Sequence, residues 1–318
     1  MRLASRQSTS LTGLLSLAVV YVVWSTTYLA IRIAVRPDSG FPPFTMAGLR
    51  IVVAGFIMLA LGALFGAVQR AAGHETDSRF RVTPAEAAVL AVSGILLWLG
   101  GNGLVSWAEQ RAASGYAALL VGSTPIWVAT MEAAIDRKPP SISLVAALAT
   151  GLAGVALLAA PVLASGAPAD VAALIALIGA PMCWGAASLL LKRRPVHAGI
   201  AGYGYQSLIG GASLLLVALL AQEPTPDPTP EAWMAWAYLV VFGSVVAFTA
   251  YSQALRSLPI TLVMTYTYVN PVGAVLLGRL LLGEPITPFT VAGAALVLLG
   301  VAGVFRQQLR PVPTVTSA

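Results

Sequence analysis

The chain has 318 residues, of which 58% are hydrophobic and only 9% are charged, and its formal net charge is +6. A water-soluble protein carries roughly 25% charged residues, so disordered chains and ordinary soluble enzymes are excluded. The single cysteine, Cys183, excludes an intrachain disulfide and a thiolate metal cluster. Because so few charged side chains are available to face water, most of the outer surface must lie against lipid.

Ten segments are apolar enough to cross a bilayer as helices, which takes about 20 residues at 1.5 Å each. They are Leu11–Val35, Phe44–Ala67, Pro84–Ala108, Ser114–Ile135, Ser141–Ala160, Asp170–Leu191, Ile200–Ala221, Ala232–Leu255, Pro259–Leu282 and Thr287–Phe305. A membrane β-barrel would show alternation instead of continuous apolar runs, and the first segment is too long for a cleavable signal peptide. The predicted fold class is an all-α integral membrane protein with ten transmembrane helices.

Basic residues predict the orientation, since short cytoplasmic loops retain lysine and arginine. With a cytoplasmic N-terminus, thirteen basic residues fall on the cytoplasmic side and four on the outer side, while Arg50 falls inside a helix. The long outer loop from Glu223 to Glu231 then carries only acids. We therefore expect both termini in the cytoplasm, and we interpret the positive charge as a topology signal, with no nucleic-acid partner.

The second half of the sequence repeats the first. A shift of 146 residues, without a gap, pairs Pro125 with Pro271, Pro139 with Pro285 and Ser106 with Ser252. A looser match pairs Trp24 with Trp184. Each half, 1–160 and 161–318, therefore has five helices, and because five is odd the second half crosses the membrane in the opposite sense. Many transporters use such inverted repeats to expose a central site to each side in turn.

Short motifs along the chain carry a family resemblance. They are Val22–Tyr28 (VVWSTTY), Pro42–Phe44, Gly48–Arg50, Ser114–Leu119, Thr124–Pro125, Tyr268–Pro271 and Leu282–Pro285. With these motifs in order over nearly its whole length, the chain resembles the EamA family of the drug/metabolite transporter superfamily, in the branch of ten-helix bacterial inner-membrane exporters. The resemblance implies two inverted five-helix repeats around a central cavity and export of amino acids or related small metabolites. The first repeat departs from the family pattern at Asp136–Pro139.

Polar and aromatic side chains inside the helices predict the binding site, because an unpaired polar group in hydrocarbon is costly. Trp24 and Trp184 each lie about 20 Å from one membrane edge, so the pair should flank the midplane. The predicted substrate-binding residues are Trp24, Thr27, Tyr28, Asn102, Ser106, Thr124, Trp184, Tyr251, Ser252, Tyr266, Tyr268 and Asn270. Pro125 and Pro271 each free a carbonyl one turn earlier, and we expect these carbonyls to bind ligand as well.

Arg50 is predicted about 9 Å below the outer surface. It could reach outward to water, cap carbonyls of a neighbouring helix, or act at a gate or on a substrate carboxylate. Glu109 is expected at the outer mouth of the third helix, as a gate or solubility charge.

Acidic residues are absent between the ends of the first and sixth helices. In the small multidrug relatives, a first-helix carboxylate exchanges protons for cationic drugs. The two histidines, His74 and His197, fall in predicted cytoplasmic loops. We therefore expect facilitated, weakly coupled transport of polar or zwitterionic solutes through a largely uncharged cavity.

Other functions stay open at this point. The same fold could export drugs or toxic compounds by proton coupling, or form a pore. An integral-membrane enzyme acting on lipid substrates would need clustered Asp, His or Glu, so an enzyme is not expected. The expected partners are a small-molecule substrate and membrane lipid, with no cofactor or metal. Small residues at four-residue spacing could build either the monomer or a homodimer: Gly62/Gly66, Ala147/Gly151 and Ala274/Gly278.

Overall fold

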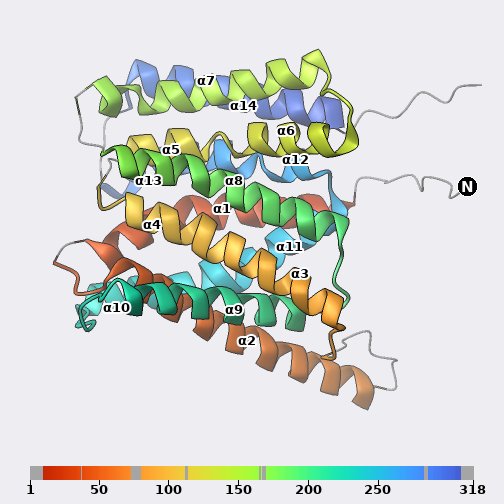
Figure 1. The fold of residues 1–318 in the computed structure, drawn as a ribbon. Helices are drawn as coiled ribbons and strands as arrows, with labels where there is room; N and C mark the ends of the chain where they lie inside the picture. Colours follow the sequence, from red (N-terminus) through yellow and green to blue (C-terminus); the bar gives the residue numbers. More distant parts are fainter. Residues whose placement is uncertain are drawn as a thin grey trace, which may run out of the picture.

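The computed structural model describes residues 10–36, 38–72, 80–111, 114–164, 166, 170–282 and 286–308. All regular structure in these ranges is helical (Figure 1). Ten helical spans are long and apolar enough to cross a membrane. The ten-helix prediction is therefore confirmed, and the first span has the predicted bounds, Leu11–Val35.

The α-helices are α1 (Leu11–Val35), α2 (Pro43–Ala71), α3 (Pro84–Gly94), α4 (Leu104–Ala108), α5 (Ser114–Val121), α6 (Thr124–Asp136), α7 (Ile142–Ala164), α8 (Val171–Arg193), α9 (Gly199–Leu220), α10 (Pro230–Tyr238), α11 (Ala247–Ser257), α12 (Ile260–Val263), α13 (Tyr266–Leu282) and α14 (Pro288–Gln308). Two π-helical segments join them, η1 (Ile95–Gly103) between α3 and α4 and η2 (Leu239–Val246) between α10 and α11.

The fourth span was predicted as one helix, Ser114–Ile135, but it is broken between α5 and α6. Hydroxyl groups at the break donate to backbone carbonyls, from Ser123 to Leu120 and from Thr124 to Val121. Pro125 lies in the first turn of α6, where proline is favoured because its missing N–H is not needed. The ninth span is broken in a similar way between α12 and α13, where the Thr265 hydroxyl donates to the Leu262 carbonyl.

The third and eighth spans each contain a π-helical segment. A shift of 146 residues carries η1, 95–103, onto 241–249, which overlaps η2. A π segment changes the backbone hydrogen-bond pattern inside a helix and is often found at functional sites. The same backbone feature therefore occurs at corresponding positions in the two halves of the chain.

Helices α2 and α9 form one of the two most extensive helix contacts, and they run antiparallel. A Cβ atom on Gly204 would lie 3.0 Å from the carbonyl oxygen of Gly55, and one on Gly211 would lie 3.1 Å from that of Gly48. Glycine lets the two backbones approach this closely. These helices are the second of each half, and an inverted repeat predicts antiparallel packing between them.

Helices α7 and α14, the fifth of each half, form the other extensive contact. A Cβ atom on Gly300 would lie 2.4 Å from the backbone nitrogen of Gly151, and one on Gly303 would lie 2.8 Å from the Cβ of Ala147. The small residues Ala147 and Gly151 are thus used inside the monomer. Gly62 is also used there, against Ile200 of α9, and a homodimer stays a prediction.

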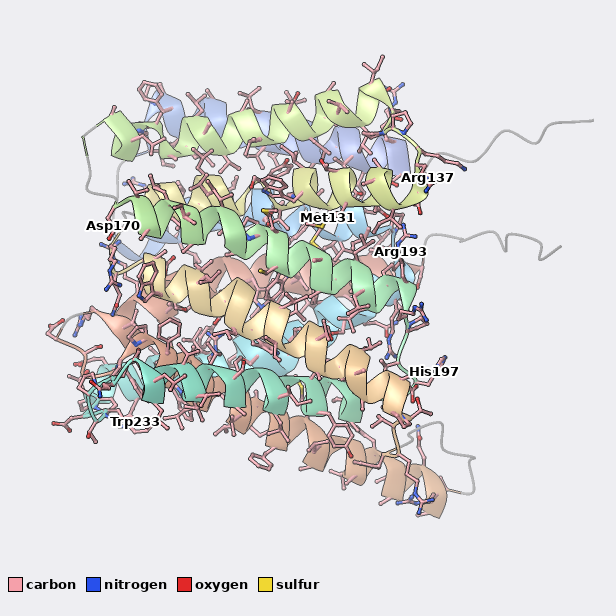
Figure 2. All side chains as sticks on the ribbon, in the orientation of Figure 1. Met131, Arg137, Asp170, Arg193, His197 and Trp233 are labelled. Atoms are coloured by element: carbon pink, nitrogen blue, oxygen red, sulfur yellow. The ribbon has the colours of Figure 1, made fainter. Side chains whose placement is uncertain are left out.

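The two ends of the bundle differ in charge. Figure 2 shows Arg137, Arg193 and His197 at the end where α1 begins, and Asp170 and Trp233 at the opposite end. We call these the N-terminal end and the Asp170 end. The distribution matches the predicted separation of basic residues, which is the basis of the orientation proposed below.

Candidate functional site

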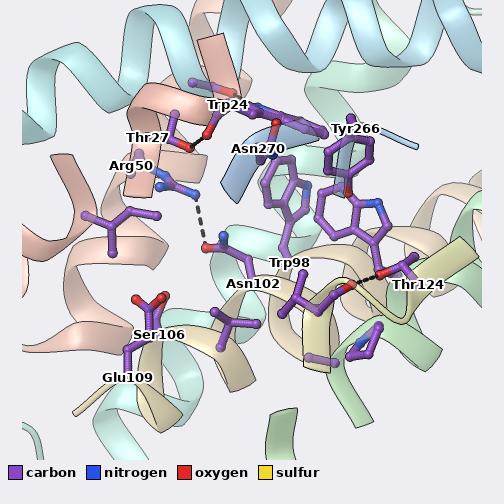
Figure 3. Close-up of a pocket in the computed structure, with 18 residues that line it drawn as sticks. Trp24, Thr27, Arg50, Trp98, Asn102, Ser106, Glu109, Thr124, Tyr266 and Asn270 are labelled. Carbon is purple, nitrogen blue, oxygen red and sulfur yellow. Dashed lines mark hydrogen bonds between the residues drawn. The ribbon is translucent and has the colours of Figure 1, made fainter. Parts of the chain in front are cut away.

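A cavity of about 110 Å³ lies between the two halves of the chain. Its walls come from α1, α2, η1, α4, α5 and α6 of the first half and from α8, η2 and α13 of the second. Figure 3 shows the polar and aromatic side chains that surround it. Ten residues singled out from the sequence line this cavity: Trp24, Thr27, Arg50, Asn102, Ser106, Glu109, Thr124, Trp184, Tyr266 and Asn270.

Aromatic rings form one wall of the cavity. Trp24 meets Trp184 edge to face, with ring centroids 5.7 Å apart, and it meets Tyr266 at 4.7 Å. Trp98 of η1 is perpendicular to Trp184, with centroids 6.1 Å apart. Edge-to-face packing places the positive edge of one ring on the negative face of the next. The wall is rigid, apolar and contributed by both halves.

Trp24 is fixed by the second π segment. Its indole Nε1–H donates to the carbonyl oxygen of Gly243 in η2, at 3.0 Å. A Cβ atom at Gly243 would lie 3.1 Å from the Thr27 side chain of α1. The π segment therefore supplies both a backbone acceptor for the tryptophan and the space for α1 to approach.

Arg50 places a buried positive charge in the cavity. Only 4% of the residue is exposed, and one guanidinium nitrogen donates to the Asn102 side-chain oxygen at 3.0 Å. Its Nε has no acceptor, and among the described residues no carboxylate lies within 4 Å of the guanidinium. A buried charge is costly unless it is paired, so this cation is suited to receive an anionic group from a solute.

Three polar side chains follow one another along the same face of the third span. Asn102, Ser106 and Glu109 are spaced by four and three residues, which places them on one side of a helix. Burial raises the pKa of the Glu109 carboxyl to about 7, and Arg32 opposes this shift. The cavity was expected to be largely uncharged, but Arg50 of α2 and Glu109 both line it. Glu109 does so because this face of the third span continues to the mouth of the cavity.

The cavity extends toward the Asp170 end of the bundle. Glu109 immediately follows α4, and Arg111, two residues later, lies 3.8 Å from the carboxylate of Asp170. The opposite direction is closed by contacts between α1 and the break in the ninth span. There the hydroxyls of Tyr21 and Thr265 are 2.6 Å apart, and Ser25 donates to the Asn270 side-chain oxygen at 3.4 Å.

Comparison with known proteins assigns the chain to a family. A model of the EamA-like transporter family matches residues 11–160 and, separately, residues 171–306. The chain belongs to the EamA-like transporter family. The uncharacterized inner membrane transporter YedA of Escherichia coli K12 is 33% identical to it over 274 residues, which cover 86% of this chain and 83% of YedA.

Other proteins match a similar share of the chain at lower identity. The uncharacterized transporter YoaV of Bacillus subtilis 168 is 22% identical over 290 residues, which cover 91% of this chain and 94% of YoaV. A crystal structure of a protein 22% identical to this chain has the same fold, with a TM-score of 0.74, and the match covers 96% of this chain and 100% of that one. The family resemblance and the fold predicted from the sequence are confirmed, and this EamA protein is a multi-pass membrane protein of a transporter family.

Three of the predicted binding residues do not line this cavity. Tyr251 is fully buried behind Trp24 and forms a hydrogen bond with Ser188. The Tyr268 hydroxyl donates to the Leu148 carbonyl oxygen at 2.9 Å, so this residue joins α13 to α7. Ser252 lines a different cavity, described below. The position of Tyr28 is predicted only from sequence, because its side chain lies outside the described residues.

The two prolines do not line the cavity, although Thr124 and Asn270 beside them do. The carbonyl freed by Pro125 is that of Val121, and it accepts the Thr124 hydroxyl at 2.6 Å. The Val121 carbonyl therefore already accepts one hydrogen bond, and because Val121 lines the cavity, binding of ligand by this carbonyl stays a prediction. Pro271 lies inside α13.

Trp98 is the main cavity residue that sequence reasoning missed. Its Nε1–H is buried with no acceptor among the described residues, and it faces the same cavity as Arg50. The signal was weak, since Trp98 lies in an apolar run without a counterpart tryptophan in the second half. The nearby Gly100 and Gly101 were a further sign, because small residues in a membrane helix mark close helix contacts. In the structure, a Cβ on Gly101 would lie 2.7 Å from Trp184.

Proposed function

We propose that this EamA protein exports amino acids or related small metabolites from the cytoplasm across the bacterial inner membrane. Transport would proceed by alternating access, with an N-terminal repeat (1–160) and an inverted C-terminal repeat (161–318) moving against each other around the central cavity. The observation that carries the proposal is a polar and aromatic cavity lined from both halves, with a buried Arg50 that lacks a carboxylate partner among the described residues.

The antiparallel pairing of corresponding helices supports the inverted repeat. The second helices of the two halves pack on each other, and so do the fifth helices. The π segments also occupy corresponding positions. In inverted-repeat transporters, the substrate site lies near the midplane at the interface of the repeats, and the Trp24–Trp184 contact has that position in this proposal.

Charges support amino acids as substrates. A guanidinium can hold the carboxylate of a solute by two parallel hydrogen bonds, and Arg50 is buried at the cavity with its Nε free of a protein acceptor. Glu109, Ser106 and Asn102 offer oxygen atoms for an ammonium group. The aromatic wall suits an apolar side chain. A zwitterion with an apolar part would use all three features.

The orientation follows from charge. The N-terminal end carries most of the basic residues, so we place it in the cytoplasm according to the positive-inside rule. The cavity then opens toward the outside, with its cytoplasmic side closed by the Tyr21–Thr265 and Ser25–Asn270 contacts. We propose weak energy coupling, because α1 and α8 contain no acidic residue.

Uptake by liposomes that contain the purified protein tests the proposal. A panel of labelled amino acids, with a lipophilic cationic drug for comparison, would be measured for the wild type and for Trp24→Ala and Asn270→Ala. Trp233→Ala is a matched control, because this tryptophan is 47% exposed and does not line the cavity. We expect uptake of at least one amino acid, lost in both site variants and kept in the control. Uptake of the drug alone, driven by a pH gradient, would favour the drug-export alternative.

A further inference from the structure

A second cavity, of about 710 Å³, lies at the N-terminal end of the bundle. It is enclosed by the end of α2, the end of α8 and the following residues 195–197, the start of α9, and α11. Three of its lining residues are basic, namely Lys192, His197 and Arg256. No acidic residue among the described ones lines it.

Three of the positions that line this cavity correspond to positions that line the central one. Ser252 corresponds to Ser106 by the 146-residue shift, and Leu191 corresponds to Ile31 by the shift that matches the two tryptophans. Ser106 and Ile31 line the central cavity, whereas Ser252 and Leu191 line the second. In an inverted repeat, a path that opens to one side has its counterpart on the other side.

The charge of the two paths differs. Glu109 at the central cavity corresponds to Leu255 at the second cavity, so the second cavity has no carboxylate at this position. The Lys192 ammonium donates to the carbonyl oxygens of Leu255 and Leu258, each at 2.8 Å. Arg256 donates to the Val196 carbonyl at 2.9 Å. These neutral backbone partners fix the two cations in place.

Acidic residues do lie close to this cavity, behind its walls. Glu132 of α6 attracts the Lys192 ammonium electrostatically, and it accepts a hydrogen bond from the Thr261 hydroxyl at 3.0 Å. Glu86 of α3 accepts the backbone N–H of His197 at 3.1 Å and lies 3.5 Å from the His197 ring. Neither carboxylate lines the cavity. The lining of the cavity itself therefore carries basic residues and, among the described residues, no carboxylate.

We propose that the second cavity is the cytoplasmic vestibule through which solute enters, and that its cations select solutes bearing a carboxylate. This rests on the proposed transport function, and it adds the site and the chemical class of the first recognition step. A cleft lined by one sign of charge raises the local concentration of counter-ions by about tenfold or more. Carboxylate-bearing solutes would then be loaded in preference to cations before they reach Arg50.

The charge of the vestibule can be measured without knowing the substrate. In a Cys183→Ser background, Leu191→Cys places one thiol on its wall, because Leu191 lines the cavity and is only half-buried, whereas Ser252 is buried. Anionic and cationic methanethiosulfonate reagents would be added separately to the cytoplasmic face in inverted membrane vesicles. We expect the anionic-to-cationic rate ratio, relative to that of a free thiol, to be about tenfold or more. Arg256→Gln and Lys192→Gln should each lower it, and 1 M salt should reduce it by screening.

Ser106→Cys in the same background is the matched control. It should react from the opposite face, in right-side-out vesicles, and its rate ratio should not change with Arg256→Gln. Since Lys192 also holds backbone carbonyls, the salt dependence tests the charge where that variant fails to fold. A ratio of one or below at Leu191→Cys, or no reaction from the cytoplasmic face, would overturn the proposal.

An anionic lipid headgroup carries the same chemistry as an anionic solute. The labelling would therefore be repeated in phosphatidylcholine membranes with and without phosphatidylglycerol. The proposal predicts equal reaction, and protection by phosphatidylglycerol would contradict it by showing a lipid site. Because no transport is measured, this result is independent of the uptake experiment. A positive vestibule with no amino-acid uptake would contradict the proposed function alone.

Discussion

Trp24 of α1 and Trp184 of α8 meet edge to face at the central cavity, with ring centroids 5.7 Å apart and ring planes at 79°. They occupy matching positions in the two halves, yet their surroundings differ. The Trp24 indole donates to Gly243, and the ring is 9% exposed, whereas Trp184 is more accessible. The pair therefore combines a fixed ring with one that is freer to contact solute.

Trp24 should contribute to stability as well as to recognition. Trp24→Ala removes a nearly buried ring and should destabilise the protein by about 3–5 kcal/mol. Trp24→Phe keeps most of the ring contacts and loses the hydrogen bond to Gly243, which costs about 1 kcal/mol. Thermal unfolding in detergent would compare the two variants. Equal loss in both would contradict the view that ring burial dominates.

Arg50 should distinguish solutes by their carboxylate. A hydrogen bond to a charged group contributes about 1.5–3 kcal/mol, so Arg50→Gln should weaken binding of a transported amino acid by roughly 10- to 150-fold. Binding of its carboxamide analogue should change far less. Dissociation constants from calorimetry test this, with Asn102→Ala to measure the part that comes from orienting the guanidinium. Equal losses for acid and amide would show that Arg50 has only a structural role.

Glu109 should make binding depend on pH near neutrality. Its carboxyl has a pKa raised to about 7, so it is mostly neutral at pH 6 and mostly ionised at pH 8. Because an ionised carboxylate is the better acceptor for an ammonium group, binding of a transported amino acid should therefore strengthen several-fold between these values. Glu109→Gln should remove that dependence, and an unchanged pH profile in this variant would exclude Glu109 as its source.

The same pKa shift has a consequence for folding. Because burial raises the pKa of Glu109 above its ordinary value of 4.5, the resulting stabilisation is present below pH 4.5 and is lost as pH rises through about 7. As pH rises from 4.5 to about 7, the unfolding temperature of the wild type should fall relative to that of Glu109→Gln. Parallel curves for the two proteins would contradict the shift.

Glycine at the contact of α7 with α14 should be essential for packing. An added Cβ at Gly300 would lie 2.4 Å from a backbone nitrogen, which cannot move aside like a side chain. We expect Gly300→Ala to lower stability by about 1–3 kcal/mol. Gly179→Ala of α8 is the control, since an added Cβ there would lie 3.7 Å from its nearest neighbour, the Cδ1 atom of Leu104. Unfolding temperatures should separate the two, and equal values would contradict the packing argument.

The location of the helices could be predicted from sequence because hydropathy and length depend on the bilayer. The breaks at Ser123 and Thr265 and the π segments could not be predicted in the same way. They depend on hydroxyl-to-carbonyl bonds and on tertiary contacts such as Trp24 with Gly243. Hydropathy is insensitive to such local changes of hydrogen bonding.

The candidate site was partly predictable, since depth and repeat symmetry indicated Trp24, Trp184 and Asn270. The same criteria also selected Tyr268, which packs against α7, because sequence does not tell whether a buried polar ring faces a cavity or a neighbouring helix. Trp98 was missed for the converse reason. It reaches the cavity through the packing of η1 on α8, a contact between segments far apart in the chain.

Alternating access is tested most directly by counterflow. Liposomes loaded with a high concentration of unlabelled amino acid would be diluted into a trace of the same labelled amino acid, and the internal label followed with time. A carrier whose single site faces one side at a time should accumulate label transiently above the outside concentration. Label that only rises to equilibrium, without an overshoot, would show an open pore and contradict the account.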